Sequence, residues 1–147
     1  MAEHVNLIKL CVGADAVEDL ATWQTRRRVE AEARGEAFRP VHVTRMWPRR
    51  AAEVLNGGSL YWVFKGQVLA RQQIVALEPR EGADGITRCA IVMQDAIIRT
   101  QAVPRRPFQG WRYLSAADAP PDLAQNRAED DDLPLEMRLA LADIGLR

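Results

Sequence analysis

Two stretches of this sequence combine cations with aromatic rings in a way that could hold a nucleotide. The first is residues 59–77, SLYWVFKGQVLARQQIVAL, and the second is residues 104–114, PRRPFQGWRYL. Arginine presents a planar fork to phosphate, and aromatic rings stack on bases, as in sites for single-stranded nucleic acid. The candidate ligand-binding residues are Arg45, Tyr61, Lys65, Arg71, Arg105, Arg106, Trp111 and Arg112.

Residues 59–77 predict a β-hairpin with Gly66 and Gln67 as its two-residue turn. Apolar, β-branched and aromatic residues flank the turn on both sides, and glycine at the first turn position is typical of a type II′ turn. This register places Arg71 opposite Trp62, where the guanidinium can stack on the indole. The alternative is a central hairpin packed on both faces, with Arg71 reaching past it to the rim.

The second stretch, residues 104–114, has no helical or strand period. Its two prolines, three arginines, three aromatic residues and one glycine predict an ordered loop that folds over the hairpin. In the alternative, Phe108 and Trp111 fill the edge of the core, and the arginines face solvent or the acidic run of residues 129–132.

The sequence contains no motif that names a reaction. There is no phosphate-binding loop, dinucleotide glycine fingerprint, nucleophile elbow or HExxH motif. The two histidines and two cysteines are scattered without metal-ligand spacing, so we expect no metal and no cofactor. An enzyme remains an alternative, namely a small hydrolase or transferase acting on a nucleotide or other anionic metabolite, with His42 or Tyr61 near the chemistry.

Several strands and helices are expected to position these residues. Near-continuous or alternating apolar runs predict strands at residues 5–12, 40–45, 86–93 and 97–103. A first helix begins at Asp15, where Glu18 completes a capping box, and ends at Gly35. A second begins at Pro48 and ends at residues 56–58. A short helical or irregular piece at residues 115–125 and a leucine-rich helix at residues 134–146 complete the chain.

The first helix carries three consecutive arginines at residues 26–28. They resemble a phosphate site, but Arg26 and Arg28 each have a glutamate four residues later. That spacing predicts ion pairs on an exposed helix surface, and the helix turns polar beyond Gln24.

Composition limits the class of protein. The chain has 147 residues, 48% of them hydrophobic and 27% charged, with a formal net charge of zero. These values predict one folded domain without a global field that would steer nucleic acid or membranes. Because no signal peptide and no membrane-spanning run is recognisable, and because the two cysteines lie in apolar segments, we expect a cytoplasmic protein with buried, reduced thiols.

The segments NLIKLCVG, GGSLYWVFKG with the following RQ, and RRPFQGWRYL with the following DAPPDL resemble the bacterial family called domain of unknown function 1489. That resemblance covers nearly the whole chain. It implies a small soluble bacterial protein, and it brings no established activity and no catalytic residues.

A second likeness, to the PUA-like superfamily with its ASCH and EVE domains, concerns the order of elements. In those domains a helix that ends at a glycine-rich stop, as residues 51–58 do here, leads into barrel strands. The likeness implies a cleft in which aromatic and basic groups hold RNA or a modified base.

Together, these features predict a single α+β domain over residues 1–147. Its sheet is bent and mixed or mostly antiparallel, a PUA-like barrel being one form of it, and three to four helices flank it. The predicted function is binding of RNA, single-stranded nucleic acid or a nucleotide between the hairpin and residues 104–114. Besides the enzyme, an alternative is a protein-interaction module that forms a homodimer or docks through residues 134–146.

Overall fold

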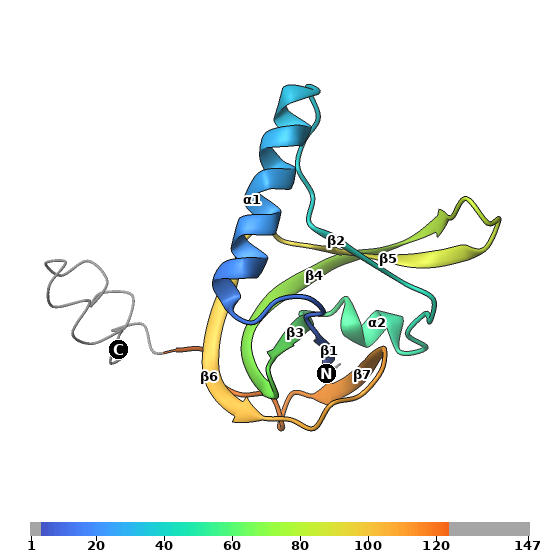
Figure 1. The fold of residues 1–147 in the computed structure, drawn as a ribbon. Coiled ribbons are helices and arrows are strands. Elements are labelled where there is room, and N and C mark those ends of the chain that lie inside the picture. Colours follow the sequence, from blue (N-terminus) through green and yellow to red (C-terminus); the bar gives the residue numbers. More distant parts are fainter. Residues whose placement is uncertain (1–3, 124–147) are drawn as a thin grey trace, which may run out of the picture.

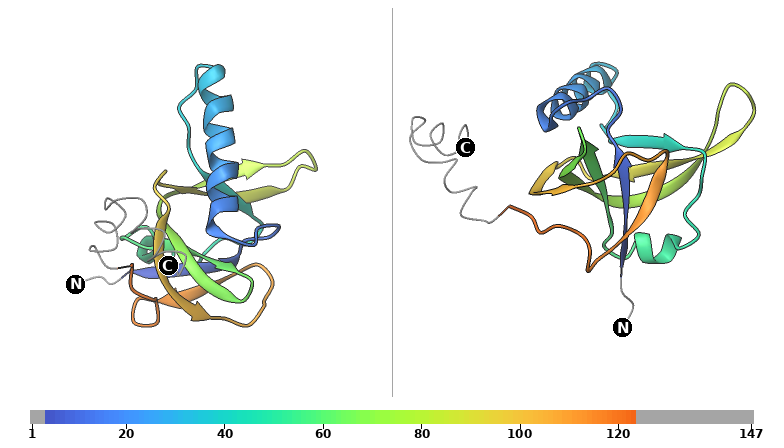
Figure 2. Two further views of the ribbon diagram at one scale, coloured as in Figure 1. Left: turned by 60° about the vertical axis from the view of Figure 1, so that its left-hand side comes forward. Right: turned by 60° about the horizontal axis from the view of Figure 1, so that its bottom comes forward.

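The computed structural model describes residues 4–123, which form seven strands and two helices (Figure 1). The strands are β1 (Val5–Leu10), β2 (Val41–Thr44), β3 (Ser59–Phe64), β4 (Gln67–Glu81), β5 (Thr87–Met93), β6 (Ile98–Pro104) and β7 (Trp111–Ser115). The helices are α1 (Val17–Ala33) and α2 (Ala51–Val54). Figure 2 shows the two helices at opposite ends of the sheet.

The strands form one mixed sheet in the order β2-β5-β4-β3-β1-β7, and β6 pairs separately with β4. β1 runs parallel to β3, whereas the other strand pairs are antiparallel. β4 connects the parts of the sheet because its first half pairs with β3 and β6 and its second half with β5. Figure 1 shows β4 and β6 curving around the core, while the far ends of β4 and β5 project beyond it.

The predicted mixed, bent sheet is confirmed, but two other parts of the fold prediction are wrong. Only two helices occur in residues 4–123, not three to four, and residues 115–123 take the irregular form of the predicted helical or irregular piece. The sheet is also not closed into a barrel, because β2 and β7, the two ends of the strand order, do not pair with each other. The predicted helix at residues 134–146, with the docking role assigned to it, lies outside the described residues.

The hairpin exists, but its predicted register is wrong, by two residues beside the turn and by one residue from Trp62 onward. Lys65 and Gly66 form the turn, both with positive φ, 48° and 81°, as a type I′ turn requires. Beyond this turn the register shifts at an irregularity between Trp62 and Val63, so that Arg71 lies opposite Tyr61 and Trp62 lies opposite Ala70. Since a shift of one residue exchanges the two faces of a strand, Arg71 does not stack on Trp62.

The second predicted stretch does fold onto the hairpin, but only its first part is a loop. The backbone N–H of Arg105 donates to the carbonyl of Gly66 at 2.7 Å. Phe108 packs against the buried cluster that includes Tyr61. From Trp111 the chain forms β7, which pairs with β1 along five residues.

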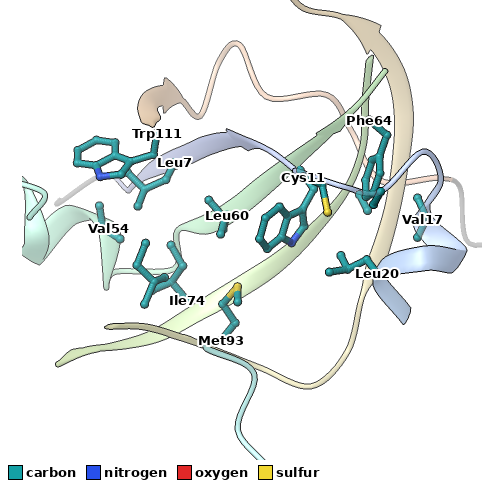
Figure 3. Packing of buried hydrophobic residues seen from close by; sticks show 14 of the residues in the cluster. Leu7, Cys11, Val17, Leu20, Val54, Leu60, Phe64, Ile74, Met93 and Trp111 are labelled. Atoms are coloured by element: carbon teal, nitrogen blue, oxygen red, sulfur yellow. The ribbon is translucent and has the colours of Figure 1, made fainter. Parts of the chain in front are cut away.

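Two hydrophobic clusters occupy the two faces of β1 and β3. The larger extends from Val54 and Trp111 near α2 to Val17 and Leu20 of α1, as Figure 3 shows. The smaller has Ile8, Tyr61, Val63, Val68 and Leu114 at its centre. Every residue of β3 is buried, because β3 lies between these clusters, and side chains on neighbouring positions of the strand point into different ones.

Residues 4–123 include no helix that is long and apolar enough to cross a membrane. In the same residues no group of three or more His, Cys, Asp or Glu side chains is placed to hold a metal ion. Cys11 and Cys89 are buried and unpaired, and burial raises the pKa of each thiol to about 11. Both cysteines are therefore thiols at neutral pH, as the sequence predicts.

Candidate functional site

A pocket of about 170 Å³ lies where α1 meets the ends of β1 and β2. We call it the α1 pocket. It is lined by Leu20, Trp23, Gln24 and Arg27 of α1, by Lys9, Leu10, Cys11 and Val12 at the end of β1, and by Val41, His42, Trp62 and Met93. Its walls thus combine two indole rings with apolar side chains, and its charged residues are two cations with no carboxylate.

The local sequence explains how α1 reaches this place. Trp23 and Arg27 are four residues apart and therefore share one face of the helix. A turn at Gly13, with φ of 84°, connects β1 to α1 and passes beside the Trp23 ring. α1 begins after Ala16, and the Asp19 carboxylate accepts the backbone N–H groups of Asp15 and Ala16 at 2.9 and 3.1 Å. Asp19, not the predicted Glu18, completes the cap.

A buried amide network fixes one wall of the α1 pocket. Gln24 and Gln72 exchange two hydrogen bonds, at 2.9 and 3.0 Å. The Trp62 indole N–H donates to the same Gln72 oxygen at 3.1 Å, and the Gln72 amide also donates to the Gln94 carbonyl at 3.1 Å. Because these buried polar groups satisfy one another, the Trp62 ring has a fixed orientation before any ligand arrives.

His42 is a polar group of the pocket that has no partner for one ring nitrogen. Its Nε2 is buried and makes no hydrogen bond within residues 4–123, while its ring meets Trp62 edge-on, with centroids 5.8 Å apart. Burial, with a smaller effect of the Lys9 charge, lowers the pKa of His42 to about 4. His42 is therefore neutral near pH 7, with one nitrogen donating and the other accepting.

A polar groove of about 470 Å³ adjoins the α1 pocket and shares Gln24, Arg27 and Val41 with it. We call it the arginine groove, after its four arginines: Arg27, Arg34, Arg39 and Arg80. Arg34 pairs with Glu36 at 3.1 Å, and Arg39 pairs with Glu78 at 2.8 Å. Arg27 has no carboxylate partner in the described part of the chain, so its guanidinium is available to a ligand.

The arginine run of α1 differs from its predicted role. Arg28 does not pair with Glu32. It forms an ion pair with Asp95 and lies over the Phe38 ring, 5.3 Å from the centroid. Of the three arginines, Arg27 faces the α1 pocket and the arginine groove.

Two of the sequence-predicted site residues, Tyr61 and Arg71, meet in another pocket, of about 320 Å³. We call it the Arg71 pocket. Its lining residues are His4, Asn6, Gly57, Ser59, Tyr61, Arg71, Ala116, Ala119, Pro120, Pro121 and Asp122. Asp122 binds the Arg71 guanidinium through both carboxylate oxygens, each at 2.8 Å. The other six predicted residues do not line this pocket.

Those other residues are distributed over the surface and the core. Arg105 and Arg112 lie over the Phe108 ring, 5.9 and 5.3 Å from its centroid. Trp111 is buried in the larger cluster, where its indole N–H donates to the Met46 carbonyl at 2.9 Å. Lys65 lies 3.7 Å from an Asp15 oxygen at the hairpin turn, and Arg45 and Arg106 are exposed.

Most residues of the α1 pocket are therefore not among the candidates that the sequence predicts. Trp23 and Arg27 have one detectable signal, their shared helix face. Gln24 has no such signal, because nothing in the sequence around a single glutamine at the start of a polar stretch indicates a hydrogen-bond partner on β4. The sequence places His42 near the chemistry of the alternative enzyme, but its Nε2 has no hydrogen-bonding partner within residues 4–123 that would activate it.

Comparison with known proteins places the chain in a family without adding a biochemical role. No curated protein and no solved structure matches it. Residues 7–147 match the family described as "Protein of unknown function (DUF1489)", in agreement with the sequence resemblance, whereas the likeness to PUA-like proteins stays a prediction. The chain belongs to the DUF1489 family of proteins of unknown function.

Proposed function

We propose that this protein binds single-stranded nucleic acid or nucleotides by holding one base in the α1 pocket. The observation that supports this most is the lining of the pocket: two tryptophans and a neutral histidine, with Lys9 and Arg27 as its charged residues and no carboxylate. A planar ring that carries a negative group fits such a lining, because indoles stack on bases and the cations attract phosphate.

The size of the pocket supports a single ring system. A cavity of about 150 Å³ is large enough for one benzene molecule, and the α1 pocket measures about 170 Å³. Drug-sized ligands occupy pockets of roughly 300 Å³ or more. A base would therefore enter the α1 pocket while its sugar and phosphate stay outside.

The polar groups of the pocket suit the edge of a base. The buried Nε2 of His42 lacks a hydrogen-bond partner in the described chain, and a base offers both donors and acceptors along its edge. The amides of Gln24 and Gln72 bind each other. His42 is therefore the polar group that remains to distinguish one base from another by hydrogen bonding. Burial lowers the pKa of Lys9, which indicates an ammonium group with reduced access to water.

The arginine groove offers a place for the phosphates next to that base. Arg27 belongs to both cavities, so a phosphate bound to it would connect a base in the α1 pocket to a strand in the groove. The zero net charge of the chain is compatible with this local arrangement, although it predicts weak long-range attraction.

Titration of the full chain with short single-stranded RNA and DNA, at several salt concentrations, tests this proposal. Trp23→Ala is expected to weaken binding by about tenfold or more, since stacking contributes roughly 1–3 kcal/mol per base. Trp47→Ala is the matched control, because Trp47 is exposed and does not line the pocket. Equal affinities of these two variants, or no binding by the wild type, would reject the proposal.

A second pair of variants tests the phosphate contact. Arg27→Gln is expected to reduce the slope of log affinity against log salt by about one, as loss of one phosphate contact does. Arg26→Gln removes the same charge from the neighbouring position, which does not line either cavity, and should leave the slope unchanged. If both variants have the same slope, Arg27 makes no specific phosphate contact.

A further inference from the structure

The Arg71 pocket lies at the other end of β1 from the α1 pocket. The α1 pocket takes Lys9 and Leu10 from β1, whereas the Arg71 pocket takes Asn6, and the two share no lining residue. Their strand β3 residues also differ, since Trp62 lines the first and Tyr61 the second. The Arg71 pocket is therefore a separate site from the α1 pocket.

Asn6 is the most unusual residue of the Arg71 pocket. It is 2% exposed, and its Oδ1 accepts the backbone N–H of Ser59 at 2.9 Å. That bond fixes which end of the amide is oxygen, so the other end is a donor, Nδ2. Nδ2 is buried and has no hydrogen-bond partner among residues 4–123. Buried donors are nearly always satisfied, so an orphaned one in a pocket wall calls for an explanation, and a ligand that accepts its hydrogen bond would supply one.

The other groups of the pocket are also mostly donors. Arg71 uses three of its five N–H groups, two toward Asp122 and one toward the Ser59 hydroxyl at 2.8 Å, and two remain. The Tyr61 hydroxyl makes no hydrogen bond within the described chain. Burial raises the pKa of Tyr61, which keeps its proton in place. A ligand that complements these groups must bring acceptors.

We propose that the Arg71 pocket binds a small oxyanion, a carboxylate or a phosphate group, with Asn6 Nδ2, the Tyr61 hydroxyl and Arg71 as its donors. The Asp122 carboxylate binds the Arg71 guanidinium through two oxygens, as such a ligand would. Asp122 therefore competes with the ligand for Arg71. The Asp122 side chain is 43% exposed and that of Arg71 is 21% exposed, so the carboxylate can turn outward while the guanidinium stays.

The backbone around Asp122 is held independently of this ion pair. The N–H of Leu123 donates to the Arg99 carbonyl at 3.0 Å, and the N–H of Gln101 donates to the Pro121 carbonyl at 2.9 Å. Removing the charge of Asp122 therefore frees Arg71 without releasing the segment, which makes Asp122→Asn a selective test of competition.

The experiment is a pair of NMR titrations of the full ¹⁵N-labelled chain, one with inorganic phosphate and one with acetate. The side-chain NH₂ signals of Asn6 and the Nε–H signal of Arg71 are expected to shift with at least one of the two anions. Comparison of the two arms decides between a phosphate and a carboxylate site. Shifts confined to the arginine groove, or no shift with either anion, would overturn the proposal.

Two variants change the affinity in opposite directions if the proposal is right. Asn6→Asp keeps the acceptor for the Ser59 N–H but replaces the orphaned donor with a negatively charged oxygen. Because that oxygen repels an anion, the affinity for the anion falls by about tenfold or more. Asp122→Asn removes the competitor, so affinity rises. Asp118→Asn makes the same charge change outside the pocket and serves as the control. If Asp122→Asn does not bind more tightly than Asp118→Asn, Asp122 is a structural partner of Arg71 and the proposal fails.

Discussion

Gln24 of α1 and Gln72 of β4 donate to each other's side-chain oxygen, although 48 residues separate them in the sequence. This reciprocal pair attaches the helix to the longest strand of the sheet. Because Gln72 also accepts the indole N–H of Trp62, one buried amide both anchors α1 and orients a wall of the α1 pocket. The fold and the candidate site therefore depend on the same contact.

Gln72→Leu tests that dependence through stability. The substitution leaves the Gln24 amide and the Trp62 N–H buried without partners, and each such group costs roughly 1–3 kcal/mol. The free energy of unfolding, measured in urea, is expected to fall by about 3 kcal/mol or more. Gln67→Leu, at an exposed position of the same strand, should change it by less than about 0.5 kcal/mol.

The double variant Gln24→Leu with Gln72→Leu extends this test. It should be less destabilised than the sum of the two single changes, since neither amide is then left without the other. Simple additivity of the two single effects would contradict the reciprocal pair.

Gly58→Ala tests the close approach of the Gly58 backbone to β1. A methyl group at this position would clash with the Val5 carbonyl oxygen and come within 2.6 Å of that of Val54. Both are backbone atoms, so the strands must separate, and we expect a loss of about 3 kcal/mol in unfolding free energy. Ser59 would also move away from Asn6.

Gly82→Ala is the matched control for Gly58→Ala. There the added methyl group meets the ends of the Arg88 and Asp84 side chains, which can shift in solvent, and a change below about 1 kcal/mol is expected. Thermal or urea unfolding of the two variants gives the comparison, and equal stability would contradict the close approach at Gly58.

The burial of His42 is expected to make the free energy of unfolding depend on pH. Its pKa is lowered by burial from 6.5 to about 4, so between these values the unfolded chain binds a proton at His42 and the folded chain does not. Stability is then fully present above pH 6.5 and decreases as the pH falls toward 4, by at most about 3 kcal/mol.

The contribution of His42 is isolated by substitution. His42→Phe should remove much of the loss of stability between pH 6.5 and 4.5, as measured by urea unfolding at both pH values. The only other histidine in the sequence, His4, lies in the Arg71 pocket, and His4→Gln serves as the control. A His42→Phe profile as steep as that of the wild type would show that the folded chain binds a proton at His42 as readily as the unfolded chain does.

The sequence predicted most of the sheet because its strands are continuous apolar runs with strong β-propensity. It did not predict the hairpin register, since Gly66 suits either position of a two-residue turn and the structure requires positive φ at Lys65, which is unusual for a lysine. This turn, together with the register shift between Trp62 and Val63, places Arg71 opposite Tyr61 instead of Trp62.

The strand β7 and the α1 pocket were missed for a different reason. Trp111–Ser115 becomes a strand by pairing with β1, more than 100 residues earlier in the sequence, and the glycine and prolines before it obscured its β-propensity. Gln24 is buried only because its partner lies on β4. Local patterns do not report contacts of this range, so residues that depend on them are found only in the structure.

Binding of a base in the α1 pocket, which Trp23 and Trp62 line, can be observed through intermolecular NOEs in the complex with a short single-stranded RNA. We expect NOEs from base protons to indole protons of both tryptophans. NOEs from the bases to Phe108 or Tyr61, with none to either of these two indoles, would contradict it and move the site to the hairpin face.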